Sequence, residues 1–203
     1  MEKYLIVGLG NPGKQYEETR HSIGWQIASD FASQNGMSFS ESKKFQAKVA
    51  TGEFKGKKTY VLLPLTYMNL SGIAVRLCLQ FYRIDISNVL VIADDVAIPF
   101  GQFRFKRDSG SGGQKGIQNI IEELKTNAFP RMRVGIGEKT RGDLSGHVLG
   151  KFTQEEKQFL PTIRDKSVEF IELWIDKGMQ EVMNRANLRS GCLEVEQNKG
   201  NGE

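Results

Sequence analysis

Residues 3–13 of the chain read KYLIVGLGNPG. The apolar, β-rich run from Tyr4 to Val7 is typical of a fully buried strand, and the glycines that follow it end the strand. The run VLVIA at residues 89–93 has the same character. Both runs therefore predict strands that lie in the buried part of a sheet.

Helices and further strands alternate with these two runs along the chain. The residues Lys55-Gly56-Lys57 predict the turn of a hairpin, and residues 101–106 alternate like an exposed strand. This order indicates an α/β domain in which helices flank a mixed, largely parallel twisted sheet with antiparallel edges. The predicted helices run from residue 23 to a stop at Gly36 and over about 71–82, 117–124 and 154–177, and the further strands lie at 45–50, 59–63, 101–106 and 131–136.

The composition is that of one water-soluble globular domain, because 39% of the residues are hydrophobic and 26% are charged. We expect this domain to span residues 1–189 and the polar tail at 190–203 to be disordered. No segment approaches the ~18 consecutive apolar residues of a membrane-spanning helix. Residues 1–8 run straight into a strand without a signal-peptide pattern, so we expect a cytoplasmic location.

Cysteine content and net charge narrow the class of protein further. Cys78 and Cys192 are too few for a disulfide framework or a zinc site, and we expect both to be ordinary thiols. The net charge of +4 is compatible with a polyanionic partner but does not require one.

Residues 8–13, GLGNPG, match the dinucleotide-binding pattern G-x-G-x-x-G. That pattern also needs an acidic residue about 20 positions further on, at the end of a second strand, where this chain has the predicted helix that contains Asp30. The helix also begins too late for its N-terminus to hold a pyrophosphate. The glycines therefore favour a tight strand-to-loop turn, and a nucleotide-dependent oxidoreductase is an alternative that rests on this pattern alone. We expect no cofactor.

The chain has two histidines, so an imidazole that acts as a general base near neutral pH must be one of them. His21 stands at the predicted start of the first helix. Asn11, Asn69 and Asp94 each follow the carboxyl end of a predicted strand or lie in its loop, and these ends share one rim where ligands bind in an open α/β sheet. We therefore expect these four side chains to converge.

Asp94 ends an apolar strand. Its carboxylate can accept a hydrogen bond from an imidazole N–H and stabilise the imidazolium cation. Asp95 is the alternative candidate for this role. Because no Ser or Cys stands in a nucleophile-elbow sequence, the chemistry indicated is attack by water, without a metal. Each residue also has a structural explanation, since His21 and Asp94 can cap turns and asparagines are common in turns. For His147 we expect a surface or packing role.

These residues belong to blocks that lie in order between residue 5 and about residue 185. The blocks are VGLGNPG (7–13), Tyr16, TRH (19–21), PLTYMNLSG (64–72), DD (94–95), GG (112–113), RMRVGIG (131–137) and VLG (148–150). In these blocks the chain resembles the bacterial-type peptidyl-tRNA hydrolases, which cleave the ester between a peptide and the terminal ribose of tRNA. The set of blocks is far more specific than any single glycine pattern.

The resemblance implies a role for each residue on the predicted rim. His21 would take a proton from water, and Asp94 would hold the imidazole of His21 in the form that can accept this proton. Asn11 would sense the blocked amino group of a peptidyl substrate, and Asn69 would fix the ester region and help to polarise its carbonyl. The residues that would contact the 3′ end of the substrate are Tyr16 and Tyr67.

The chain departs from this family at residues 112–116, GGQKG, where the family commonly has His and then Asn. Lys115 therefore stands where an asparagine amide usually meets the substrate, and its cation could bind a tRNA phosphate instead. Ser22 also replaces a common asparagine, with less consequence expected.

Basic side chains on the predicted strands fit a tRNA partner. Arg104 and Lys106, like Arg131 and Arg133, alternate along a strand, so each pair is expected to project to one face, with Lys115 between them. Because no aromatic side chains interleave, we expect phosphate positioning rather than base reading. Solvated surface charge is the alternative. The residues selected as tRNA-binding are Lys106, Lys115 and Arg133.

Together these features predict a metal-independent, cytoplasmic ester hydrolase that recycles peptidyl-tRNA into tRNA and peptide, and the resemblance implies that it is a monomer. A non-catalytic RNA-binding relative on the same fold is the alternative, because the change at Gln114 and Lys115 lies in the predicted site. The presence of all four rim residues favours the enzyme.

Overall fold

Seven strands form one mixed sheet in the computed structural model, which describes residues 1–137 and 143–187. The strand order is β2-β3-β4-β1-β5-β7-β6. The central strands are parallel, and the edge strands pair antiparallel. The prediction of a largely parallel sheet with antiparallel edges is therefore confirmed. The strands are β1 (Lys3–Gly8), β2 (Phe39–Ser42), β3 (Ala47–Phe54), β4 (Lys57–Pro64), β5 (Val89–Asp95), β6 (Phe103–Lys106) and β7 (Arg131–Gly135).

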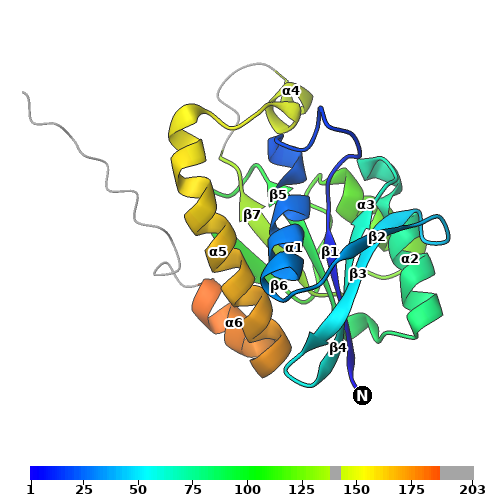
Figure 1. The fold of residues 1–203 in the computed structure, drawn as a ribbon. Coiled ribbons are helices and arrows are strands. Elements are labelled where there is room, and N and C mark those ends of the chain that lie inside the picture. The colour runs from blue at the N-terminus through cyan, green and yellow to red at the C-terminus, as the bar shows by residue number, and fades with distance from the viewer. Residues whose placement is uncertain (138–142, 188–203) are drawn as a thin grey trace, which may run out of the picture.

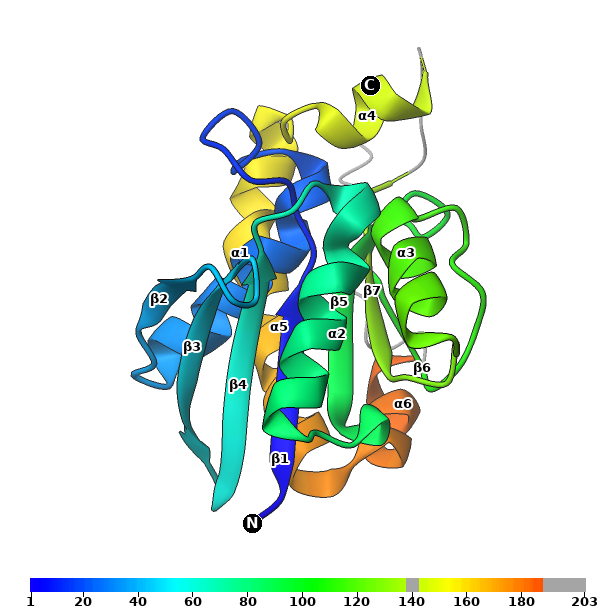
Figure 2. The same cartoon turned by 90° about the vertical axis from the view of Figure 1, so that its right-hand side faces the viewer.

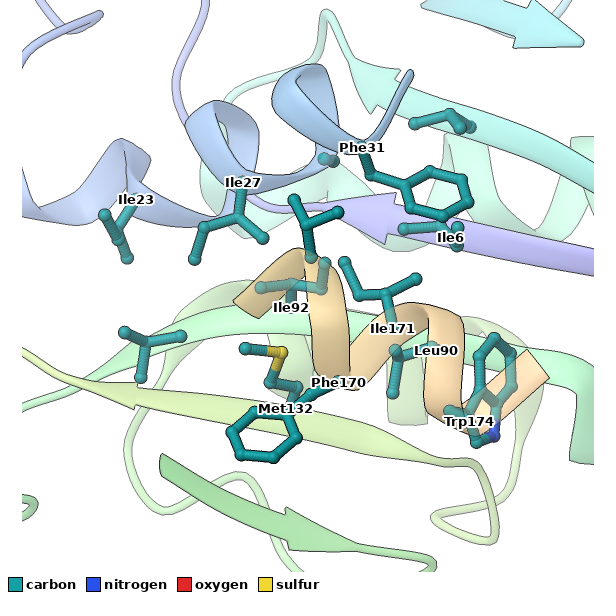
Figure 3. Close-up of a cluster of buried hydrophobic side chains, with 14 of the residues drawn as sticks. Ile6, Ile23, Ile27, Phe31, Leu90, Ile92, Met132, Phe170, Ile171 and Trp174 are labelled. Carbon is teal, nitrogen blue, oxygen red and sulfur yellow. The ribbon is translucent and has the colours of Figure 1, made fainter. Parts of the chain in front are cut away.

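The central strands are apolar on both faces because a layer of helices covers each face. Successive side chains of a strand point to opposite sides, so Ile6 of β1 packs into one core cluster and Val7 into the other. The first layer consists of α1 (Ile23–Gln34), α5 (Gln154–Lys177) and α6 (Met179–Ala186) (Figure 1). Figure 3 shows Phe31 of α1 and Ile171 of α5 close to Ile6. The second layer consists of α2 (Ser71–Tyr82) and α3 (Lys115–Leu124) (Figure 2).

The elements that the sequence did not predict are short or exposed. The edge strand β2 is half-exposed along its length and has no apolar run. The helix α4 (Leu144–Leu149) is only 6 residues long, too short to show a helical period. α6 follows α5 after Gly178, which has a φ of +84°. Within the described ranges, no helix is long and apolar enough to cross a membrane.

The predicted end of the domain at residue 189, the tail at 190–203 and Cys192 lie outside the described residues. The hairpin predicted around Gly56 is present, because β3 and β4 pair antiparallel on either side of it. The first helix also ends before Gly36, which has a φ of +66° that an L side chain rarely adopts.

Candidate active site

A pocket of about 560 Å³ opens at the carboxyl ends of the central strands. α4 lies beyond these strand ends, at the opposite end of the molecule from the N-terminus (Figure 2), and Leu144 and Leu149 of this helix line the pocket. The structure therefore brings the predicted rim residues to one cavity. The four are Asn11, His21, Asn69 and Asp94.

His21 is paired with Asp94 across the start of α1. His21 lies in the short 3-10 helix η1 (Arg20–Ser22). The Nδ1 atom of His21 is 2.9 Å from Oδ1 and 2.8 Å from Oδ2 of Asp94. Because a carboxylate only accepts hydrogen bonds, the neutral ring must carry its proton on Nδ1, which leaves the Nε2 lone pair free to accept a proton. The side chain of His21 is 12% exposed, so it remains accessible from the pocket.

Two glycines allow α1 to approach the sheet closely enough for this pairing. A Cβ on Gly24 would lie 2.3 Å from the carbonyl oxygen of Ile92, and a Cβ on Gly8 would lie 2.4 Å from the carbonyl oxygen of Gly24. The first glycine of the motif at residues 8–13 thus serves the close packing of α1 on β1, a different role from the strand-to-loop turn that the sequence favoured. The role of Gly24 was not recognised from the sequence, because it gives no local signal beyond one glycine in a helix.

Asp94 and its rival Asp95 have different partners. Asp95 accepts hydrogen bonds from a guanidinium nitrogen of Arg133 at 2.8 Å and from the backbone N–H of Ala97 at 2.9 Å. Asp94 instead accepts from Gln114 Nε2 at 3.0 Å, besides its contact with His21. Asp94 is therefore the carboxylate that faces the histidine.

The two asparagines lie on loops that are fastened to one another. Asn11 is buried, and its Oδ1 accepts a hydrogen bond from the backbone N–H of Met68 at 2.8 Å. That bond fixes the start of the 3-10 helix η2 (Met68–Leu70), which presents Asn69 at the pocket as an exposed side chain. Asn69 is thus part of the pocket lining, with a side chain that can both donate and accept hydrogen bonds.

A family model described as peptidyl-tRNA hydrolase matches residues 5–195. The chain belongs to the peptidyl-tRNA hydrolase family. The peptidyl-tRNA hydrolase of Clostridium novyi is 40% identical over 184 residues, which cover 91% of this chain and 97% of that relative. The peptidyl-tRNA hydrolase of Methylacidiphilum infernorum is 43% identical over 183 residues, which cover 90% and 96% of the two chains.

The likeness to this family extends from sequence to fold. A crystal structure of peptidyl-tRNA hydrolase from Acinetobacter baumannii matches with a TM-score of 0.86 at 33% identity and covers 91% of this chain and 94% of that one. The resemblance inferred from the sequence blocks is therefore confirmed, as is the fold that it implied.

The remaining predicted site residues of this peptidyl-tRNA hydrolase family member do not all line the pocket. Tyr67 is 60% exposed and lines the pocket, whereas Tyr16 is half-buried in the loop before η1 and is not part of the lining. Lys115 is the first residue of α3 and is exposed at the pocket. Lys106 is exposed at the end of the edge strand β6, outside the lining.

The two arginines of β7 are engaged within the protein. Arg133 lines the pocket, but its guanidinium donates to Asp95 and to the carbonyl oxygens of Gly110 and Ser111. Arg131 and Arg133 do project to one face, since both donate to the carbonyl oxygen of Gly110. The expectation that Arg131 is a basic group at the surface is wrong, because Arg131 is fully buried. Burial, together with repulsion from Arg133, lowers its pKa to about 10. Arg131 is buried because the loop before α3 passes over it. The carbonyl oxygens of Ser109 and Gly110 in that loop accept hydrogen bonds from its guanidinium.

Two further side chains that could be reactive, His147 and Cys78, lie outside the pocket lining. His147 lies 3.2 Å through Nε2 from the carbonyl oxygen of Gly137 and is not part of the pocket lining. Burial raises the pKa of the Cys78 thiol to about 12, which disfavours the reactive thiolate. Among residues 1–137 and 143–187, no group of three or more His, Cys, Asp or Glu side chains could hold a metal ion.

Proposed function

We propose that the chain hydrolyses the ester bond between peptide and tRNA in peptidyl-tRNA, with His21 as the general base that activates water. Membership of the peptidyl-tRNA hydrolase family supports this substrate and reaction. The observation that carries the proposed mechanism is the contact of His21 Nδ1 with the Asp94 carboxylate at the edge of an open pocket. It leaves Nε2 as the basic nitrogen on the side away from Asp94.

In the proposed reaction, Nε2 of His21 takes a proton from water as the oxygen attacks the acyl carbon of the ester. Asp94 stabilises the imidazolium that forms, and the imidazolium then gives its proton to the departing ribose oxygen. The acid product gains the hydroxyl group of water, and the tRNA gains its proton. General-base assistance of this kind contributes about 10²- to 10⁴-fold.

Asn69 would donate to the oxyanion that develops on the ester carbonyl. A single donor aimed at such an oxyanion is worth about 10²- to 10³-fold in rate. Asn11 would recognise the blocked amino end of the substrate, since it lines the same pocket and is held against η2. Both roles rest on the family resemblance and on the position of these side chains at the pocket.

The tRNA would be held by exposed cations and by the open edge of the pocket. Lys115 and Lys106 are both exposed, so they are available for phosphate contacts. Arg133 as a tRNA contact stays a prediction, because its guanidinium already binds Asp95 and two loop carbonyls. Tyr67 offers an exposed ring at the pocket for the 3′ end, and Tyr16 lies further away in the loop before η1.

The direct test is to incubate the purified chain with N-acetyl-aminoacyl-tRNA and, separately, with the unblocked aminoacyl-tRNA, both in excess chelator. We expect catalytic release of free tRNA from the blocked substrate, and much slower release from the unblocked one. Binding of tRNA without turnover would favour the non-catalytic RNA-binding alternative. Turnover that occurs only in a parallel reaction without the chelator would contradict a metal-independent mechanism.

A further inference from the structure

Gln114 makes two hydrogen bonds that link the catalytic carboxylate to a helix. Its Oε1 accepts from the backbone N–H of Ile117 at 2.9 Å, and its Nε2 donates to Asp94 Oδ1 at 3.0 Å. The orientation of the amide is fixed by chemistry, because a backbone N–H can only donate and a carboxylate can only accept. Gln114 is buried, with 9% of the residue exposed, so little water competes with either bond.

The backbone that carries Gln114 is also held in place. Gln114 is the N-cap of α3, and its own N–H donates to the carbonyl oxygen of Ser111 at 3.2 Å. The preceding loop is fastened at Gly110 by the guanidinium groups of Arg131 and Arg133. The amide therefore meets Asp94 from a position that is organised before substrate arrives.

We propose that Gln114 is a positioning residue that fixes the Asp94 carboxylate against His21. This inference rests on the proposed function. Asp94 accepts from the His21 ring and from the Gln114 amide together, so its orientation is defined by two donors. The positive end of the amide dipole also offsets part of the carboxylate charge, and the imidazolium is stabilised less than it would be by Asp94 alone.

Other charged groups also lie around this pair. Lys115 at the start of α3 and the Asp95–Arg133 pair line the same pocket. Arg20, next to His21 in η1, is paired with Glu156 at the start of α5. A substitution of Gln114 leaves all of these charges in the chain, so their effect on His21 is common to the wild type and the variants.

Two substitutions separate positioning from helix capping. Gln114→Ser keeps a side-chain oxygen that can cap α3 but cannot reach Asp94, whereas Gln114→Met keeps the length but loses both bonds. We expect both variants to lose kcat about 10- to 100-fold with little change in KM, because each removes one hydrogen bond to a charged group. Only Gln114→Met should also lower Tm, by about 2–4 °C. Gln118→Ala, an exposed glutamine of the same helix, is the matched control.

A second readout follows the charge state of the histidine. In both variants the acidic limb of the pH profile of kcat/KM should move to higher pH, and the ring resonance of His21 should titrate with a higher midpoint in NMR spectra. Since the chain has two histidines, His147 is an internal reference, and a His147→Asn variant assigns the signals. The resonance of His147 should not move.

The outcomes distinguish this inference from the proposed function. If the wild-type chain hydrolyses the blocked substrate but both variants keep its kcat and pH profile, the positioning role is refuted and the proposed function stands. If activity falls only in Gln114→Met and follows its Tm, Gln114 is merely a helix cap. If the wild-type chain has no hydrolytic activity, the proposed function fails, while the NMR titration of the variants still decides whether Gln114 acts on His21.

Discussion

Consecutive carboxylates at the end of β5 have different partners because successive side chains of a strand point to opposite faces. Asp94 turns toward His21 and Gln114, and Asp95 turns toward Arg133. The sequence predicted that a carboxylate at this strand end would meet His21, but left Asp95 as a rival. Which of the two carboxylates meets His21 depends on which face of β5 is covered by η1. The sequence does not show this, because it depends on how β1, which leads into η1, pairs with β5 in the folded protein.

At the residue scale, Asp94→Asn should lower kcat by on the order of 10³- to 10⁴-fold, because an amide no longer fixes the proton on Nδ1 or stabilises the imidazolium. Affinity for tRNA should change little. The matched control is Asp95→Asn, which removes a neighbouring carboxylate without touching the histidine. Equal losses of kcat in the two variants, measured under single-turnover conditions, would show that Asp94 has no special role.

At the element scale, the site depends on how closely α1 packs on the sheet. The backbone N–H of Trp25 donates to the carbonyl oxygen of Leu9, and the N–H of Leu9 donates to the carbonyl oxygen of Ile92, so the first turn of α1 is tied to β1 and β5 together. The helical period predicted α1 well, because its apolar face is regular from Ile23 to Phe31. The spacing of apolar residues does not show how close α1 lies to the sheet, because that distance is set by Gly24.

Gly24→Ala tests that closeness. Its new Cβ would lie within 3 Å of backbone atoms of Ile92 and Leu9, so α1 must move away from the sheet. We expect a loss of about 1–3 kcal/mol in the free energy of unfolding, together with a fall in kcat as His21 leaves Asp94. Gly36→Asn is the control, because no atom lies within 4 Å of a Cβ there and Asn tolerates a positive φ. Urea denaturation measures the first effect, and an unchanged midpoint for Gly24→Ala would contradict it.

Over the whole molecule, the repeating apolar patterns of the sequence predicted the helices and strands. The contacts made by the loop before α3 could not be predicted in this way. Apolar runs on both faces of β1 and β5 predicted a covered, largely parallel sheet, and the rule for strand ends predicted the rim. The loop before α3 has no period. Its path buries Arg131 and engages Arg133, and it brings Gln114 onto Asp94, so the predicted basic face was partly wrong.

Charge over the whole surface gives a salt-dependent prediction. If Lys106 and Lys115 each bind a phosphate, changing either one to Ala should flatten the dependence of log KM on log salt concentration by about 0.7 to 0.9. Lys166→Ala is the control, because Lys166 lies on α5 and pairs with Glu169. KM measured across a salt series provides the slopes. A slope that stays at the wild-type value would remove that lysine from the tRNA footprint.

The proposed mechanism requires one imidazole, held by Asp94, to deprotonate the attacking water. It is tested most directly by single-turnover hydrolysis of N-acetyl-aminoacyl-tRNA by the wild-type chain and by His21→Asn, with tRNA affinity measured alongside. The Asn side chain lacks a basic nitrogen, so we predict a rate lower by about 10²- to 10⁴-fold and a tRNA Kd within about twofold of the wild-type value. A His21→Asn variant that cleaves the ester at the wild-type rate would contradict this mechanism.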